Sequence, residues 1–195
     1  MKERPVIFNG EMVHAILDGR KTQTRRVINP QPTLSERTGF NWNGAAYGIG
    51  STYRDTVRNF ANCFKVCPFG QVGDRLWVRE TWAPESIDAE DGSYSPDYRA
   101  TANGQPLDGR WTPSIHMPRW ASRILLEITG VRVERLNDIS DGDAIREGCS
   151  AADMKSGDCV SDVFARLWSS IYGEESWRAN PWVWVIEFRR VEVEK

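Results

Sequence analysis

The chain has 195 residues, a formal net charge of −2 and 27% charged residues. This length suits one domain over residues 1–195, and the near-zero charge excludes a polybasic tail while leaving a local basic patch open. Apolar residues make up 40% of the sequence, which is typical of a folded protein. Because no apolar run of about 18 residues and no secretory signal is present, we expect a cytoplasmic protein without a membrane span.

The N-terminal part of the chain predicts a strand, a short helix and a second strand. Residues 4–8 are extended and largely apolar. Apolar residues then recur with the period of a helix, which Gly19 is expected to end. Residues 21–28 contain two threonines and close on valine and isoleucine, a composition typical of a strand. The apolar face of the helix consists of Met12, Val13, Ile16 and Leu17.

Two long segments of low periodicity interrupt the predicted elements. Residues 31–66 are rich in Asn, Gly, Thr and Ser, and we expect them to be ordered only if their aromatic side chains dock on the core. Residues 84–113 contain four prolines and form a second loop-rich insertion. Residues 75–81, between the two, alternate as a strand. The aromatic residues of the first insertion are Phe40, Trp42, Tyr47 and Tyr53.

The C-terminal part predicts a long β segment, two helices and a closing strand. Residues 122–136 form the β segment, with a bulge or bend at Gly130. Residues 141–147 and 163–172 form the helices, and residues 182–193 form a nearly continuous apolar strand. Strands outnumber helices and no connection is a regular crossover helix. We therefore expect an α+β fold built on a small closed β-barrel with peripheral short helices.

The four cysteines do not follow a zinc-binding pattern. Cys63 and Cys67 are spaced as one half of a zinc site, but Cys149 and Cys159 lie ten residues apart. With only two histidines in the chain, the second half of such a site is poor. We expect free thiols in a reducing compartment and no metal.

Residues 19–26 (GRKTQTRR) carry the densest cluster of reactive side chains, with four cations, two hydroxyls and no carboxylate. The cluster is compatible with a solvated basic strand. It is equally compatible with a surface that neutralises phosphates. A third reading pairs a lysine base with a threonine nucleophile, provided that the ammonium is desolvated enough to lose its proton.

At this cluster the sequence resembles a known family. The pattern Gly19-x-Lys21-Thr22-x-Thr24-x-Arg26 after a short helix resembles the opening motif of the ASCH domain, a PUA-like barrel. Similar motifs follow in order at residues 73–80 (GDRLWVRE), 136–148 and 184–188 (WVIEF), with the two insertions between them. Residues 115–123 (IHMPRWASR) are similar to ASCH-type proteins of phages and prophages.

The resemblance implies an activity and two alternatives. A small bacterial ASCH group hydrolyses the amide of N4-acetylcytidine with a lysine, a threonine three residues later and a glutamate from a later short helix. The matching positions are Lys21, Thr24 and Glu147, and no cofactor is implied. The alternatives are a non-catalytic RNA- or nucleotide-binding ASCH module of phage origin and an ASCH-type ribonuclease.

The residue types at positions 21, 24 and 147 are chemically suited to amide hydrolysis. The Thr24 hydroxyl would attack the acyl carbon, with neutral Lys21 as the base. If Lys21 stays charged, it would instead stabilise the oxyanion, with water as the nucleophile. In a regular strand Lys21 and Thr24 point to opposite faces, so they converge only if the chain bends just after Gly19.

Four further residues are candidates for binding a small nucleoside substrate. Glu80 and Trp82 follow the second motif and are expected near the barrel mouth, although a structural salt bridge is the simpler role for Glu80. Arg26 and Arg119 would anchor a phosphate or pair with carboxylates. An RNA partner stays open, and the sequence does not predict an oligomeric state.

Overall fold

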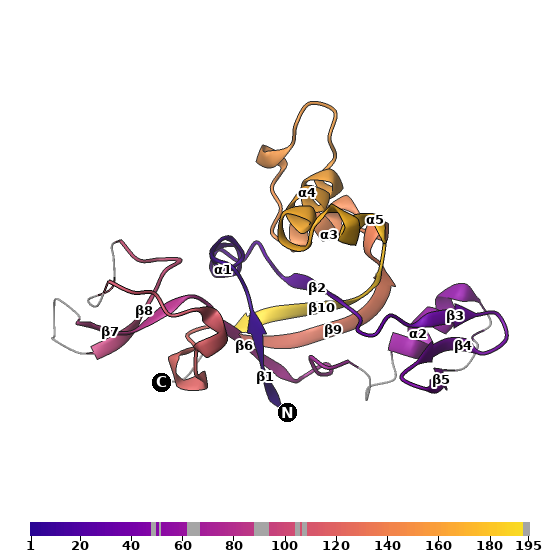
Figure 1. The fold of residues 1–195 in the computed structure, drawn as a ribbon, viewed down its shortest axis with the longest axis horizontal. Helices are drawn as coiled ribbons and strands as arrows, with labels where there is room; N and C mark the ends of the chain where they lie inside the picture. Colours follow the sequence, from indigo (N-terminus) through magenta and orange to yellow (C-terminus); the bar gives the residue numbers. More distant parts are fainter. Residues whose placement is uncertain are drawn as a thin grey trace.

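The computed structural model describes residues 1–47, 50, 52–61, 67–87, 94–103, 106 and 109–192. Its centre is a five-stranded sheet with the order β1-β6-β9-β10-β2 (Figure 1). β1 and β6 pair in parallel, and the other neighbours pair antiparallel. The strands are β1 (Glu3–Ile7), β2 (Gln23–Val27), β6 (Arg75–Arg79), β9 (Leu125–Arg135) and β10 (Trp182–Val191).

Five α-helices accompany the sheet within the described residues, and none of them is long and apolar enough to cross a membrane. Side-chain caps fix two helix starts: the Asn9 side chain accepts from the Met12 amide, and the Ser140 side chain accepts from the Asp143 amide. The helices are α1 (Gly10–Leu17), α2 (Tyr53–Ala61), α3 (Asp141–Arg146), α4 (Val160–Tyr172) and α5 (Glu174–Arg178). Short 3₁₀ turns cover Ser114–His116, Arg119–Ala121, Leu136–Asp138 and Ala151–Asp153.

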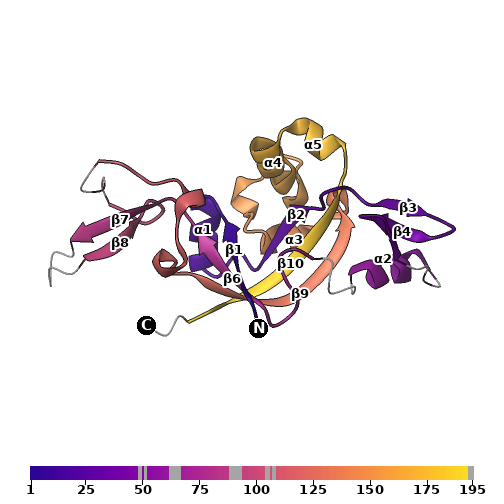
Figure 2. The same ribbon diagram turned by 60° about the horizontal axis from the view of Figure 1, so that its bottom comes forward.

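β9 and β10 form a long curved ribbon that spans the molecule (Figures 1 and 2). Glu187 pairs with Gly130, whereas the next residue, Phe188, pairs with Ile128. One residue of β9 is therefore extra, which confirms the bulge predicted around Gly130. A bulge increases the local twist and bends the strand, so it contributes to the curvature of the ribbon.

The expected closed barrel is wrong for the described residues, because β1 and β2 remain the two edges of an open sheet. The two edge strands are linked through a side chain rather than by backbone hydrogen bonds between the strands. Arg26 of β2 donates to the carbonyl of Ile7 at the end of β1, over 2.7 Å, and its guanidinium lies over the Phe8 ring. The predicted α+β composition is confirmed. Closure of a barrel would require β1 and β2 to form backbone hydrogen bonds with each other.

β10 supplies apolar side chains to both faces of the sheet. Trp182, Trp184 and Ile186 belong to one buried cluster, and Val183 and Val185 belong to another. The alternation follows from the two-residue period of a strand, and it explains why this segment is almost continuously apolar. The second cluster lies beneath α3 and α4, which cover that face of β10. The organisation as one domain over residues 1–195 stays a prediction.

The first insertion is ordered by aromatic contacts, as the sequence required. It contains the strands β3 (Thr33–Ser35), β4 (Gly39–Trp42) and β5 (Ala45–Tyr47) together with α2, so it is more regular than the loop predicted. Phe40 stacks on Phe60 with 4.6 Å between ring centroids, and Phe60 stacks on Trp184 of β10 at 5.7 Å. The insertion is therefore anchored to the central sheet.

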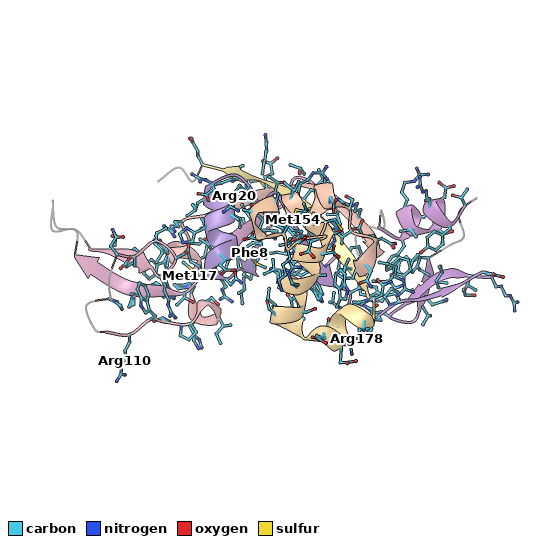
Figure 3. The ribbon with its side chains drawn as sticks, turned by 90° about the horizontal axis from the view of Figure 1, so that it is seen from above. Phe8, Arg20, Arg110, Met117, Met154 and Arg178 are labelled. Atoms are coloured by element: carbon cyan, nitrogen blue, oxygen red, sulfur yellow. The ribbon has the colours of Figure 1, made fainter. Side chains whose placement is uncertain are left out.

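The second insertion forms a hairpin at the opposite end of the molecule (Figure 1). Its strands are β7 (Trp82–Ile87) and β8 (Tyr94–Tyr98), which pair antiparallel. Trp82 packs with Met117 and Ala121 in a small separate core. In the view from above, Met117 lies toward this hairpin, and Arg178 marks the end of α5 away from it (Figure 3).

Replacing Phe60 by Ala tests the aromatic anchor. Phe60 is fully buried between the insertion and β10, so we expect Phe60→Ala to lower the free energy of unfolding by about 3–5 kcal/mol in urea titrations. Tyr53→Ala is the control, because Tyr53 is mostly exposed and the change is expected to cost less than about 1 kcal/mol. Equal losses in the two variants would contradict the anchor.

Candidate functional site

The chain turns sharply between α1 and β2, and this turn places Lys21. Gly19 has a φ of +73°, a conformation that glycine adopts readily. The Lys21 amide donates to the Ala15 carbonyl, and the Thr22 amide donates to the Arg146 carbonyl, each over 2.8 Å. Because β2 begins only at Gln23, Lys21 belongs to the turn rather than to the strand. The bend that Lys21 and Thr24 require is therefore present.

Lys21 and Glu147 form a buried ion pair. The Lys21 Nζ donates to Glu147 Oε2 over 2.8 Å and to the Glu147 backbone carbonyl over 2.7 Å. Lys21 is 2% exposed and Glu147 is 3% exposed. Glu147 follows directly after α3, and Gly148 with a φ of +98° then turns the chain away. A Cβ at Gly148 would stand 3.0 Å from the Ala15 Cβ, so glycine permits this close approach to α1.

Arg25 holds the other oxygen of the same carboxylate. Its Nη1 donates to Glu147 Oε1 over 3.0 Å, and its Nη2 contacts Asp143 Oδ2 at 3.3 Å and Glu134. Arg132 of β9 also contacts Glu134 and Asp143, which extends the network to the central strand of the sheet. Glu147 is thus shared between two buried cations, one on each oxygen.

The protein environment changes the acid–base properties of this cluster. Burial lowers the pKa of the Lys21 ammonium, and the charge and hydrogen bond of Glu147 oppose this shift without cancelling it. Burial also raises the pKa of the nearby Cys149 thiol to about 11. Lys21 is therefore easier to deprotonate than an exposed lysine, whereas Cys149 is a neutral thiol at physiological pH.

A cavity of about 200 Å³ opens beside the ion pair, and Thr24 and Glu147 both line it. Arg25 and Arg26 contribute its remaining charged wall. The opposite wall is apolar and comes mainly from α4, through Phe164, Leu167, Trp168, Ile171 and Tyr172. Phe8 lies between α1 and the α3–α5 group (Figure 3). The Lys21 ammonium is 5.7 Å from the centroid of the Phe8 ring.

Four of the seven residues proposed from the sequence lie in one region. Thr24, Arg26 and Glu147 line the cavity, and Lys21, which does not line it, is connected to it by the ion pair with Glu147. The others lie elsewhere. Glu80 is buried in a two-point ion pair with Arg123, at 2.9 Å for each bond, and it does not line this cavity.

Trp82 and Arg119 also have structural partners. Trp82 is buried in the hairpin core against Trp120, with 5.6 Å between ring centroids. The Arg119 Nε donates to Glu3 over 2.8 Å at the start of β1. Neither side chain lines the Thr24 cavity, so their assignment to substrate binding has no support from its geometry.

The basic cluster at residues 19–26 does not form a continuous charged surface. Lys21 and Arg25 are buried, and Arg26 is half-buried against Phe8. Arg20 is exposed and pairs with Asp18. The sequence did not reveal the role of Arg25, because its partners Glu134, Asp143 and Glu147 lie more than 100 residues further along the chain.

Metal ligation has no candidate within the residues that the structure describes, where no group of three or more His, Cys, Asp or Glu side chains could hold an ion. Cys67 and Cys149 are buried free thiols, and Cys159 is an exposed free thiol. Cys63 lies outside the described residues, so the expectation that Cys63 and Cys67 do not bind zinc stays a prediction.

Comparison with known proteins gives distant similarities of structure. The chain is similar to an ASCH domain from Lactobacillus crispatus JV V101, with 13% identity, a TM-score of 0.46, and coverage of 98% of this chain and 81% of that one. It is also similar to protein EF3133 from Enterococcus faecalis V583, with 11% identity, a TM-score of 0.44, and coverage of 100% and 84%. No protein-family model and no curated protein matches the sequence. Neither structural likeness carries information on activity.

The lowered pKa of Lys21 can be measured directly. The chain has five lysines, Lys2, Lys21, Lys65, Lys155 and Lys195, so ¹³C-lysine labelling gives few resonances, and Lys21→Arg identifies the one of interest. We expect Lys21 to titrate at a lower pH than a free lysine side chain, because burial disfavours the charged form. A Lys21 titration at or above that of a free lysine would show that Glu147 outweighs burial.

Proposed function

We propose that this protein hydrolyses the N4-acyl amide of an N4-acetylcytidine-like cytosine nucleoside in the Thr24 cavity. The observation that carries the proposal is the buried contact between Lys21 and Glu147, because Glu147 and Thr24 line the same cavity. Nucleophilic acyl transfer needs a nucleophile and a base that is held in place. In this proposal Thr24 supplies the hydroxyl, Lys21 supplies an amine whose pKa is lowered by burial, and Glu147 orients that amine. They come from two distant parts of the chain, so only folding can bring them close to one another.

In the proposed reaction the Thr24 Oγ attacks the acyl carbon, and its proton passes to neutral Lys21 through a hydrogen bond or one bridging water. Arg26, at the cavity edge, provides positive charge for the developing oxyanion. The C–N bond then breaks, and the proton goes from Lys21 to the departing cytosine N4. Water cleaves the resulting Thr24 ester, which returns the hydroxyl and releases the carboxylic acid.

The size and chemistry of the cavity favour a base over a whole nucleoside. Its volume of about 200 Å³ is smaller than the roughly 300–1,000 Å³ typical of sites that enclose drug-sized ligands. The aromatic residues of its α4 wall suit a flat ring, on which stacking is favourable. The acylated base therefore occupies the cavity in this proposal, and the sugar stays at the mouth.

The test is an ultraviolet assay in which purified protein converts N4-acetylcytidine to cytidine. Thr24→Val should lower kcat by roughly a thousandfold or more, because the nucleophile is lost, while Thr24→Ser keeps measurable activity. Thr22→Val is the matched control, since Thr22 lies two residues before Thr24, does not line the cavity and uses only its backbone in the described contacts. It is expected to be close to wild type.

Two further variants assign the remaining roles in the same assay. Lys21→Arg should lower kcat by about 10²–10⁴-fold, because a guanidinium does not deprotonate usefully. Glu147→Gln should lower turnover while circular dichroism shows a folded protein. Activity that survives Thr24→Val would exclude Thr24 as the nucleophile, and the absence of hydrolysis for every acyl group tried would favour the non-catalytic RNA- or nucleotide-binding alternative.

A further inference from the structure

Arg25 is a buried cation that the proposed chemistry does not use. It follows Thr24 on β2, and its side chain is fully buried. Its guanidinium lies 5.7 Å from the centre of the Phe164 ring of α4 and contacts carboxylates from β9 and α3. Burying a guanidinium is costly unless several carboxylates compensate it, as they do here.

The contacts around Glu147 show how Arg25 bears on the candidate site. Glu147 presents Oε2 to the Lys21 ammonium and Oε1 to the Arg25 guanidinium, so the carboxylate is divided between two cations. We propose that Arg25 is a positioning residue, which holds Glu147 through Oε1 and thereby weakens the hold of this carboxylate on the proton of Lys21. The inference rests on the proposed function, in which neutral Lys21 is the base.

Two electrostatic effects of Arg25 act in the same direction. Its positive charge disfavours a second positive charge on Lys21, since both cations contact the same carboxylate and little water screens them. It also takes part of the negative charge of Glu147, which would otherwise stabilise the Lys21 ammonium alone. Removing Arg25 should therefore make Lys21 harder to deprotonate.

Among the residues that the structure describes, several titratable and charged groups face Lys21 and Arg25. Lys21 is faced by Glu147, by the Cys149 thiol after α3 and by Arg26 on β2. Arg25 is faced by Glu147 and Asp143 from the α3 segment and by Glu134 from β9. α1 contributes the Ala15 carbonyl to the Lys21 amide, and α4 contributes the Phe164 ring to Arg25.

Arg132 provides a matched control within the same network. It contacts Glu134 and Asp143, as Arg25 does, but not Glu147. A loss of stability that follows from breaking the network in general is therefore shared by variants of both arginines. A change in the Lys21 titration that is transmitted through Glu147 is expected only for variants of Arg25, because Arg25 contacts Glu147 and Arg132 does not.

The experiment is the ¹³C-lysine titration of Lys21 in the wild type, Arg25→Gln and Arg132→Gln. We expect the Lys21 titration to move to higher pH by about one unit in Arg25→Gln and to stay in place in Arg132→Gln. The pH profile of N4-acetylcytidine hydrolysis provides the second readout. Its rise from the acid side should move by the same amount in Arg25→Gln, because the neutral fraction of Lys21 falls about tenfold at a given pH below its midpoint.

A folding defect in Arg25→Gln would not block the test. The double variant Arg25→Gln/Glu134→Gln removes one charge of each sign and leaves the net charge of the network unchanged, and it should show the same upward movement of Lys21. An unchanged or lowered Lys21 titration in whichever of these variants folds would overturn the inference. If Lys21 moves as expected but the wild type hydrolyses nothing, the control of Lys21 by Arg25 stands and the proposed function fails.

Discussion

The contact between Lys21 and Glu147 is the interaction on which the candidate site depends, and it joins residues 126 positions apart. It fixes the turn after α1 against the end of α3, where the Thr22 amide and the Arg146 carbonyl add a backbone link. Burying an ion pair costs desolvation energy that is recovered only when further polar contacts satisfy both ions. Arg25 and the Glu147 carbonyl supply those contacts, so the pair is part of a compensated network rather than an isolated salt bridge.

The sheet places this pair beside a cavity. β10 presents Val183 and Val185 to the cluster beneath α3 and α4, while its paired neighbour β2 carries Thr24 and Arg25. α4 is thereby held opposite β2, and its apolar side becomes the wall of the cavity. The two insertions dock at the opposite ends of the central ribbon, and none of their described residues lines the Thr24 cavity. The described parts of the two insertions are thus separated in space from the candidate site.

Local signals in the sequence predict the strands of the central sheet and the helices α1, α3 and α4, but not the strands and the helix inside the two insertions. Long-range contacts could not be predicted from the sequence. The apolar face of α1, the glycine at residue 19 and the bulge near Gly130 each depend on a few neighbouring residues, and all three are present. The burial of Arg25 depends on carboxylates from β9 and α3, which no local pattern indicates. The excess of strands, the lack of crossover helices and the resemblance to a PUA-like barrel predict barrel closure, whereas closure depends on whether the edges β1 and β2 meet. Lys21, Thr24 and Glu147 follow from motif resemblance. The geometry joins Lys21 to Glu147 and places Glu147 and Thr24 on one cavity, and the roles of the three residues stay predictions.

Trapping of the covalent intermediate tests the central claim most directly. Protein that turns over N4-acetylcytidine is quenched with acid, digested and analysed by mass spectrometry. The mechanism predicts one acetyl group on the peptide that contains Thr24, and none on that peptide in Thr24→Val. Accumulation of cytidine without any acyl group on Thr24 in a rapid-quench series would contradict the account, because the amide would then be cleaved by water or by another residue.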